Sequence, residues 1–215
     1  MNEEHSMSLT LQGAFAKMPL LAVLRGIHPD EAEAVGEALI AAGFTALEVT
    51  LDSPEPFTSI ERLAKRFGEE AFVLAGTVLK PDAIAAVAQA GGRAIVAPNL
   101  NESVVRETKR AGLLSMPGVL TPTEAFNALD YGADALKIFP GDAISPAVIK
   151  GMKAVLPAGT QICVTGGITA ENIGGFLAAG TDAVGIGSAL FKHGRPASEI
   201  EAEARRLVEA VRGAL

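Results

Sequence analysis

Short apolar runs alternate with longer alanine-rich stretches along most of the chain, and this repeat limits the fold more than any other feature. The runs are rich in Val, Ile and Leu, as buried strands are, whereas the longer stretches have the spacing of amphipathic helices. Such alternation is typical of repeated strand–helix units that build a parallel sheet. Eight runs can be counted, centred near Val23, Glu48, Leu74, Val96, Ser115, Lys137, Cys163 and Gly185.

The spacing of these runs predicts a closed barrel. From residue 23 to residue 185, seven intervals cover 162 residues, or about 23 residues per unit, as compact βα repeats require. We therefore expect an α/β protein with a single (β/α)₈ TIM-barrel domain over residues 1–215. The first dozen or so residues lie outside the repeat, and we expect residues 1–15 to include a frayed extension or a short leading helix.

Glycine and proline mark the expected ends of the helices. Glycines that follow a periodic stretch and precede an apolar run are typical of helix C-caps, as at Gly43, Gly91, Gly112, Gly132 and Gly180. Prolines are predicted to lie in the first turn of a helix at Pro29, Pro54, Pro81, Pro122 and Pro146. The segment Thr121–Glu124 has the pattern of a capping box.

Composition excludes several classes of protein. The formal net charge is −7 and basic runs are absent, so we expect no nucleic-acid partner. No apolar run approaches the 18 residues of a transmembrane helix, and the start of the chain lacks the pattern of a signal peptide. The only cysteine is Cys163, so no internal disulfide can form. We expect a cytoplasmic protein with no membrane partner.

Metal and cofactor motifs are also missing from the sequence. His5, His28 and His193 lack metal-ligand spacing, and we interpret them as solvated or capping residues. Cys163 lies in the middle of an apolar run and is predicted to be a small core residue. The sequence has no dinucleotide fingerprint, P-loop or carboxylate cluster suited to a divalent metal. We therefore expect neither a metal nor a cofactor.

Two charged residues occupy positions that should face the barrel interior. In the run Ala46–Leu51, Leu47, Val49 and Leu51 form one apolar face, which leaves Glu48 on the other. The same count in Asp134–Phe139 directs Lys137 inward. A catalytic site is one explanation for these inward charges. The alternatives are a buried structural ion pair and an error of one residue in the assignment of a strand. The cost of burying unpaired charges favours a site.

Other candidate residues lie where the strands end. Arg25 and Thr77 close the first and third apolar runs, at the rim where active sites of such barrels lie. Glycines follow the seventh and eighth runs, in Thr165–Thr169 and Gly185–Ser188. Loops in these two positions form the usual phosphate site of such barrels, because glycine lets backbone N–H groups approach an anion. Each glycine motif alone is also compatible with a simple tight turn.

These residues and their neighbours resemble the 2-keto-3-deoxy-6-phosphogluconate (KDPG) and 2-keto-3-deoxy-6-phosphogalactonate (KDPGal) aldolase family. The resemblance runs from Leu20 to about Phe191. It is carried by the segments 22–26 (AVLRG), 47–51 (LEVTL), 75–79 (AGTVL), 97–99 (APN), 117–118 (PG), 121–124 (TPTE), 135–140 (ALKIFP) and 166–168 (GGI).

The resemblance implies roles for individual residues. Lys137 matches the family's imine-forming lysine, and Glu48 matches its general acid/base. Arg25 and Thr77 match ligands of the pyruvyl end of the substrate, with Pro98 and Phe139 beside them. The phosphate-binding loops are matched by Gly166, Gly167, Gly187 and Ser188. The resemblance also implies a class I aldolase that needs no metal, acts on a phosphorylated 2-keto-3-deoxy sugar acid and forms a homotrimer.

Two other functions remain compatible with the same residues. A cofactor-free sugar-phosphate isomerase or epimerase would share the phosphate loops and inward charged residues, but would release no pyruvate. A non-catalytic sugar-phosphate-binding protein would be stabilised by its ligand without turnover.

The choice between the two C4 epimers rests on conflicting residues. The segment Asp52–Pro54 is closer to the Asn-Ser-Pro of the galactonate branch than to the arginine of the gluconate branch, although Asp52 itself matches neither. Ile138 and Phe139 after Lys137 also resemble the galactonate branch, whereas Thr165 resembles the gluconate branch. One hydrogen bond gives roughly a tenfold preference. We predict cleavage of both epimers, with the galactonate epimer modestly preferred.

Overall fold

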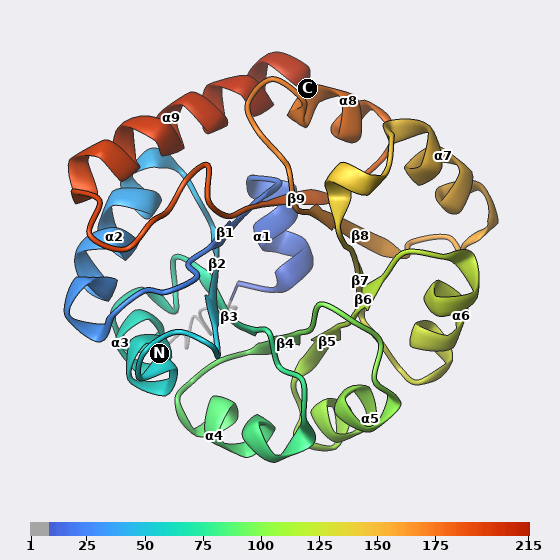
Figure 1. The fold of residues 1–215 in the computed structure, drawn as a ribbon, viewed down its shortest axis with the longest axis horizontal. Coiled ribbons are helices and arrows are strands. Elements are labelled where there is room, and N and C mark those ends of the chain that lie inside the picture. The colour runs from blue at the N-terminus through green and yellow to red at the C-terminus, as the bar shows by residue number, and fades with distance from the viewer. Residues whose placement is uncertain (1–8) are drawn as a thin grey trace, which may run out of the picture.

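The computed structural model describes residues 9–215 and confirms the expected barrel. A ring of parallel strands is surrounded by helices, and each strand run is followed by a helix that returns the chain to the next strand (Figure 1). All eight runs named above contain a strand at the expected centre. The strands are β1 (Leu20–Val23), β2 (Ala46–Thr50), β3 (Phe72–Gly76), β4 (Ala94–Val96), β5 (Leu114–Met116), β6 (Gly118–Val119), β7 (Ala135–Ile138), β8 (Gln161–Thr165) and β9 (Ala183–Ile186).

The nine strand segments correspond to eight βα units, because β5 and β6 are two parts of one run. Pro117 separates them, since proline has no N–H to donate to a neighbouring strand. The run pairs with β4 on one side and with β7 on the other. Backbone bonds from Asp134 N–H to the Ser115 carbonyl (2.9 Å) and from Lys137 N–H to the Pro117 carbonyl (2.9 Å) close the ring.

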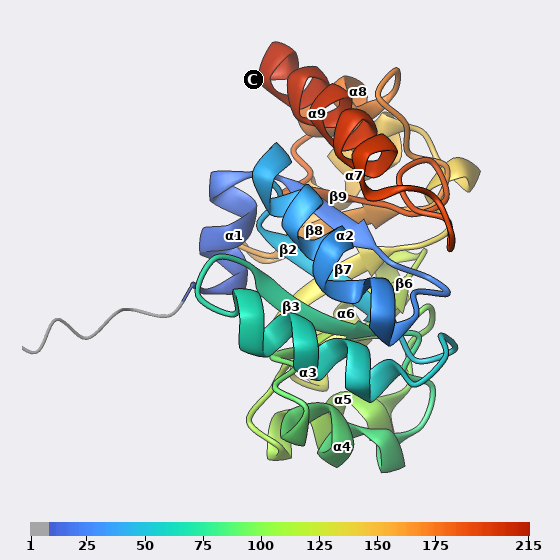
Figure 2. The ribbon, with the colours of Figure 1, turned by 90° about the vertical axis from the view of Figure 1, so that its left-hand side faces the viewer.

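Helices cover the outside of the barrel, as the side view shows (Figure 2). They are α2 (Pro29–Ala42), α3 (Pro56–Phe67), α4 (Ile84–Gln89), α5 (Glu102–Arg110), α6 (Pro122–Asp130), α7 (Pro146–Val155), α8 (Ile173–Ala178) and α9 (Ala197–Ala214), with short 3₁₀ helices η1 (Pro81–Ala83) and η2 (Gly141–Ala143). None of the helices in residues 9–215 is both long and apolar enough to cross a membrane.

A further helix, α1 (Leu11–Lys17), covers the N-terminal end of the barrel. Leu11 and Phe15 are buried against side chains of the barrel interior, and the Thr45 hydroxyl donates to the Ala14 carbonyl at 2.8 Å. Of the frayed extension and the short leading helix expected near the start of the chain, the described residues show a helix. Residues 1–8, and with them His5, lie outside the described residues.

Two apolar cores lie on the two sides of the strand ring, and they confirm the alternation expected within each strand. Leu47, Val49, Leu136 and Ile138 belong to the core between strands and helices. A smaller core fills the barrel interior; it joins Leu11, Ala14 and Phe15 of α1 to the inward side chains of the strands, namely Leu21, Val23, Ala46, Phe72, Leu74, Ala94, Val96, Met116, Ala135, Cys163 and Ala183. Residues facing this interior therefore share one desolvated space.

The predicted helix ends are confirmed with one exception. All five predicted C-cap glycines follow a helix with positive φ, between 74° and 111°. The Thr121 side chain and Glu124 form the expected capping box at α6. The prediction for Pro54 was wrong: α3 begins at Pro56, and Glu55 precedes it with φ 42°. Either proline suits a first turn, so the local signal did not decide between them.

Two aspartates tie the N-terminal ends of strands to the surrounding helices in the same way. Asp182 accepts bonds from the Ile162 N–H (2.8 Å) and from Lys153 Nζ of α7 (2.6 Å). Asp134 accepts from the Ser115 N–H (2.8 Å) and from Lys109 Nζ of α5. Each carboxylate thus accepts a hydrogen bond from the backbone of a preceding strand and anchors a helix. Both lie at the N-terminal rim of the barrel, opposite the rim that carries Arg25 and Thr165.

We expect Asp182→Ala to lower the free energy of unfolding by about 1–3 kcal/mol, because it leaves the Ile162 N–H without a partner. Glu107→Ala, which removes only an exposed pair with Arg110, should change it by about 0.5 kcal/mol or less. Urea denaturation of both variants measures the difference. Equal effects of the two substitutions would contradict the anchoring role of Asp182.

Candidate active site

The barrel interior brings Glu48 of β2 and Lys137 of β7 together from opposite parts of the ring. Glu48 is 0% exposed and Lys137 is 5% exposed. Lys137 Nζ lies 3.8 Å from Glu48 Oε1 and 5.4 Å from the centre of the Phe139 ring. Both residues continue the stack of inward side chains above the apolar interior core. The inward directions predicted for Glu48 and Lys137 are therefore confirmed.

The carboxylate of Glu48 is held by packing and has no hydrogen bond. Neither of its oxygens has a hydrogen-bond partner among residues 9–215. Space for the side chain comes from Gly76, because a Cβ atom there would lie 2.0 Å from Glu48 Oε1. A buried carboxylate without hydrogen bonds costs stability. The arrangement is therefore poor as a structural ion pair and leaves two acceptors for a bound water or substrate hydroxyl.

Arg25 lies at the C-terminal rim, where three loops meet. Its guanidinium forms a hydrogen-bonded ion pair with Asp52, from the loop after β2. It also donates to the Thr77 hydroxyl, after β3, at 3.0 Å. Thr77 adopts φ 57°, which is unfavourable for a β-branched residue. The Ser53 hydroxyl accepts from the Gly26 N–H at 2.9 Å. The loops after β1 and β2 are therefore joined by this hydrogen bond as well as by the ion pair of Arg25 and Asp52.

A cavity of about 500 Å³ opens at this rim. Its walls include eight of the predicted site residues, namely Arg25, Lys137, Phe139, Thr165, Gly166, Gly167, Gly187 and Ser188. Thr77 and Glu48 are joined to it through Arg25 and Lys137. Pro98 does not line the cavity; it lies against Gly118, whose own strand partner is Lys137.

The glycine loops present backbone donors without protein partners. Gly166 and Gly167 have φ of 101° and 66°, a conformation that glycine allows and other residues resist. In residues 9–215, no hydrogen bond is donated by the N–H groups of Gly166, Gly167, Ile168, Gly187 and Ser188. Loops of this kind are suited to bind an anion through several N–H groups.

Some residues of the site could not be recognised individually from the sequence. Val23, Ile168, Thr169 and Ala189 also line the cavity. Val23 simply ends an apolar strand, while Ile168 and Thr169 follow the glycine pair and were identifiable only as part of that motif. Asp52 stands out in the sequence because it matches neither branch of the family, but its bond to Arg25 depends on the approach of two loops.

Other candidate groups stay structural. Burial raises the pKa of the Cys163 thiol to about 12, so the thiol stays protonated and acts as a small core side chain, as expected. His28 and His193 stack with ring centroids 4.0 Å apart, and His193 Nδ1 lies 2.7 Å from Glu31 Oε1. Within the described part of the chain, no group of three or more metal-ligating side chains is assembled.

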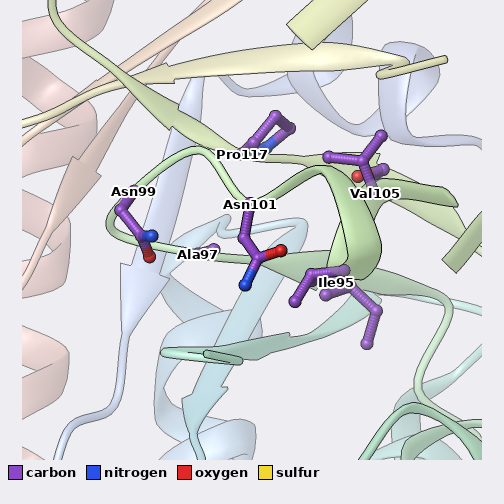
Figure 3. A pocket seen from close by; sticks show the side chains of 8 residues that line it. Ile95, Ala97, Asn99, Asn101, Val105 and Pro117 are labelled. Atoms are coloured by element: carbon purple, nitrogen blue, oxygen red, sulfur yellow. The ribbon is translucent and has the colours of Figure 1, made fainter. Parts of the chain in front are cut away.

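A second hollow lies between the end of β4 and α5 (Figure 3). It is lined by Ile95, Ala97, Asn99, Asn101, Val104, Val105, Ser115 and Pro117, and it has no room for a water molecule. The Asn101 side chain beside it accepts from the Ser103 N–H (3.0 Å) and donates to the Leu79 carbonyl (3.4 Å). This hollow is therefore a packing feature at the start of a helix.

Comparison with known proteins agrees with this geometry. The family model described as "KDPG and KHG aldolase" matches residues 11–207. The chain belongs to this aldolase family. Its members are carbon–carbon lyases, and the fold class and family expected from the sequence are both confirmed.

Individual relatives differ in how similar they are to this aldolase. It is 44% identical to 2-dehydro-3-deoxy-6-phosphogalactonate aldolase of Escherichia coli (strain K12) over 93% of this chain and 97% of that protein. Identity to the KHG/KDPG aldolase of the same organism is 33%, over 74% and 75%. A solved structure described as "Native KDPGal structure" superposes with a TM-score of 0.89 at 44% identity, covering 92% of this chain and 96% of that one.

We expect Gly76→Ala to reduce aldolase turnover by roughly 10²-fold or more, because the new methyl group would displace the Glu48 carboxylate. Glu48→Gln, which keeps the shape and removes the base, is the reference, with an expected loss of roughly 10² to 10⁴. Gly151→Ala, on helix α7 with no atom within 4 Å of the added Cβ, is the matched control and should keep full turnover. Normal turnover in a folded Gly76→Ala variant would contradict this account.

Proposed function

We propose that this aldolase cleaves KDPGal, KDPG or both to pyruvate and D-glyceraldehyde 3-phosphate through an imine on Lys137. The observation that carries the proposal is the buried pair of Lys137 and Glu48, which lies beneath a cavity rimmed by Arg25 and the two glycine loops. A phosphorylated keto acid has an anionic group at each end and a ketone near one of them. The cavity offers a cation, several free N–H groups and an amine.

The chemistry follows from these two side chains. The neutral Lys137 amine attacks the C2 ketone, and loss of water gives a protonated imine that accepts electrons from the C3–C4 bond. Glu48, through a water, takes the proton of the C4 hydroxyl as that bond breaks and glyceraldehyde 3-phosphate leaves. The resulting enamine is protonated at C3, and water hydrolyses the imine to release pyruvate and free Lys137. The two unpartnered oxygens of Glu48 support this role.

The ends of the substrate are assigned to different parts of the cavity. The carboxylate of the pyruvyl end is placed at Arg25 and Thr77, with Phe139 beside Lys137 and Pro98 behind it. The phosphate is placed at the donor groups of Gly166, Gly167, Gly187 and Ser188. These loops follow β8 and β9, the last two strands of the ring, as in other phosphate-binding barrels. No metal and no cofactor takes part in the proposed reaction.

We also propose that the chain works as a cytoplasmic homotrimer. Large apolar side chains are exposed on several βα units, among them Leu79 (50%) and Phe126 (41%), and such groups are commonly covered in oligomers. A native mass other than three times the 22.1 kDa chain would exclude the trimer. A reducing cytoplasm suits the single free thiol, Cys163.

The preferred epimer is proposed to be KDPGal. This choice is supported by the higher identity to the relative named 2-dehydro-3-deoxy-6-phosphogalactonate aldolase (44%) than to the KHG/KDPG aldolase (33%). Thr165 opposes an absolute preference, because its side chain lies over Gly185 and lines the cavity where the C4 and C5 hydroxyls would pass. Asp52 adds a carboxylate beside Arg25. Hydrogen-bond acceptors are therefore available both at Thr165 and at Asp52.

Both epimers can be tested in one assay, with pyruvate release followed by lactate dehydrogenase. We expect turnover of KDPGal and KDPG, with a several-fold higher kcat/KM for KDPGal, because one hydrogen bond supplies roughly a tenfold preference. A hundredfold preference for KDPG would reverse the epimer assignment and direct attention to Thr165. Absence of pyruvate from either substrate would reject the proposed function.

A further inference from the structure

Asn172 closes the loop that follows β8 through its side-chain amide. Its Oδ1 accepts from the Thr169 N–H at 2.9 Å, and its Nδ2 donates to the Gly167 carbonyl at 2.9 Å. The side chain itself does not line the cavity, whereas Gly167, Ile168 and Thr169 do. Asn172 therefore contacts the wall of the site from behind.

The bond to the Gly167 carbonyl orients one particular peptide group. The only cis peptide among the described residues is Phe139–Pro140, so the peptide that joins Gly167 to Ile168 is trans. In a trans peptide the carbonyl and the N–H point in opposite directions. Holding the carbonyl toward Asn172 thus turns the Ile168 N–H away from Asn172, and that N–H is one of the loop donors without a protein partner.

The hydrogen bonds of Asn172 matter because the backbone of this loop has few conformational restrictions of its own. Gly166 and Gly167 both adopt left-handed backbone conformations, and adjacent glycines have many other conformations open to them. The same loop is tied at a second point, because Glu171 accepts a bond from Arg206 of α9 at 2.9 Å. Interaction with the Thr169 side chain is the main cause that lowers the pKa of Glu171 to about 2, followed by the bond from Arg206. Glu171 consequently stays charged at neutral pH.

We propose that Asn172 is a positioning residue for the phosphate end of the substrate, which it serves by fixing the Gly167–Ile168 peptide with the Ile168 N–H toward the cavity. The inference rests on the proposed function, since it assigns the anion of that loop to a phosphorylated substrate. It separates two tasks of the site: the Lys137 and Glu48 pair acts on the ketone, while Asn172 affects only how the far end is held.

The test runs the reaction in the direction of synthesis, with pyruvate and two aldehydes that differ only in phosphate. In Asn172→Ala we expect the KM for D-glyceraldehyde 3-phosphate to rise roughly three- to tenfold, as loss of one or two hydrogen bonds gives. The KM for unphosphorylated D-glyceraldehyde and the kcat with either aldehyde should stay unchanged. Exchange of the methyl protons of pyruvate for deuterium, which needs the imine but no aldehyde, should keep its normal rate.

Asn101→Ala is the matched control. Asn101 also accepts from a backbone N–H and donates to a carbonyl, but α5 lies in another part of the ring from α8 (Figure 1). This variant should change neither KM. An equal rise of KM for both aldehydes in Asn172→Ala, or no rise for either, would overturn the inference. If the unmodified protein fails to exchange pyruvate protons, the proposed function fails instead.

Discussion

The burial of two opposite charges in one apolar barrel is the constraint on which the rest of the site depends. Lys137 Nζ and Glu48 Oε1 lie 3.8 Å apart, and the carboxylate accepts no hydrogen bond from residues 9–215, in a space otherwise filled mainly by apolar side chains. Desolvation opposes charge on both groups, and their mutual attraction supports it. Because the pair has few hydrogen bonds within the protein, a polar substrate or a water molecule that enters can supply them. A catalytic site can use the interaction energy gained in this way.

The surrounding residues position the Lys137 and Glu48 side chains and shape the rim of the cavity above them. Gly76 supplies the space that the Glu48 side chain occupies, and Pro117 donates no N–H yet offers its carbonyl to the Lys137 backbone. At the rim, Arg25 is held between Asp52 and Thr77 by hydrogen bonds within the protein. A preorganised cation loses less conformational freedom on binding. In the proposed mechanism, the reacting side chains therefore belong to strands, and the residues that bind the ends of the substrate belong to loops.

Much of this arrangement could be predicted from the sequence because a barrel strand has a simple geometry. Alternation with a period of two directed Glu48 and Lys137 inward, and the glycine pairs identified the two loops that carry free N–H groups. Such inferences need only local order along one strand or turn. The predicted roles of Arg25, Thr77, Thr165 and the glycine loops in binding remain proposals.

The rest could not be predicted because it depends on contacts between distant segments. The break of the fifth run at Pro117 and the start of α3 at Pro56 rather than Pro54 are exceptions, because there a local signal was compatible with more than one outcome. Pairing of Arg25 with Asp52, which lies 27 positions away, requires the relative placement of two loops. The position of Pro98 outside the cavity, behind Gly118, depends likewise on how two neighbouring strands end.

Covalent trapping tests the central claim most directly, since the account assigns imine formation to one buried lysine. After incubation with pyruvate and borohydride, the account predicts a stable three-carbon label on the single peptide that contains Lys137, and no label in a Lys137→Ala variant. A label on the more exposed Lys80 or on Lys153, which instead anchors Asp182, or no label at all, would contradict it.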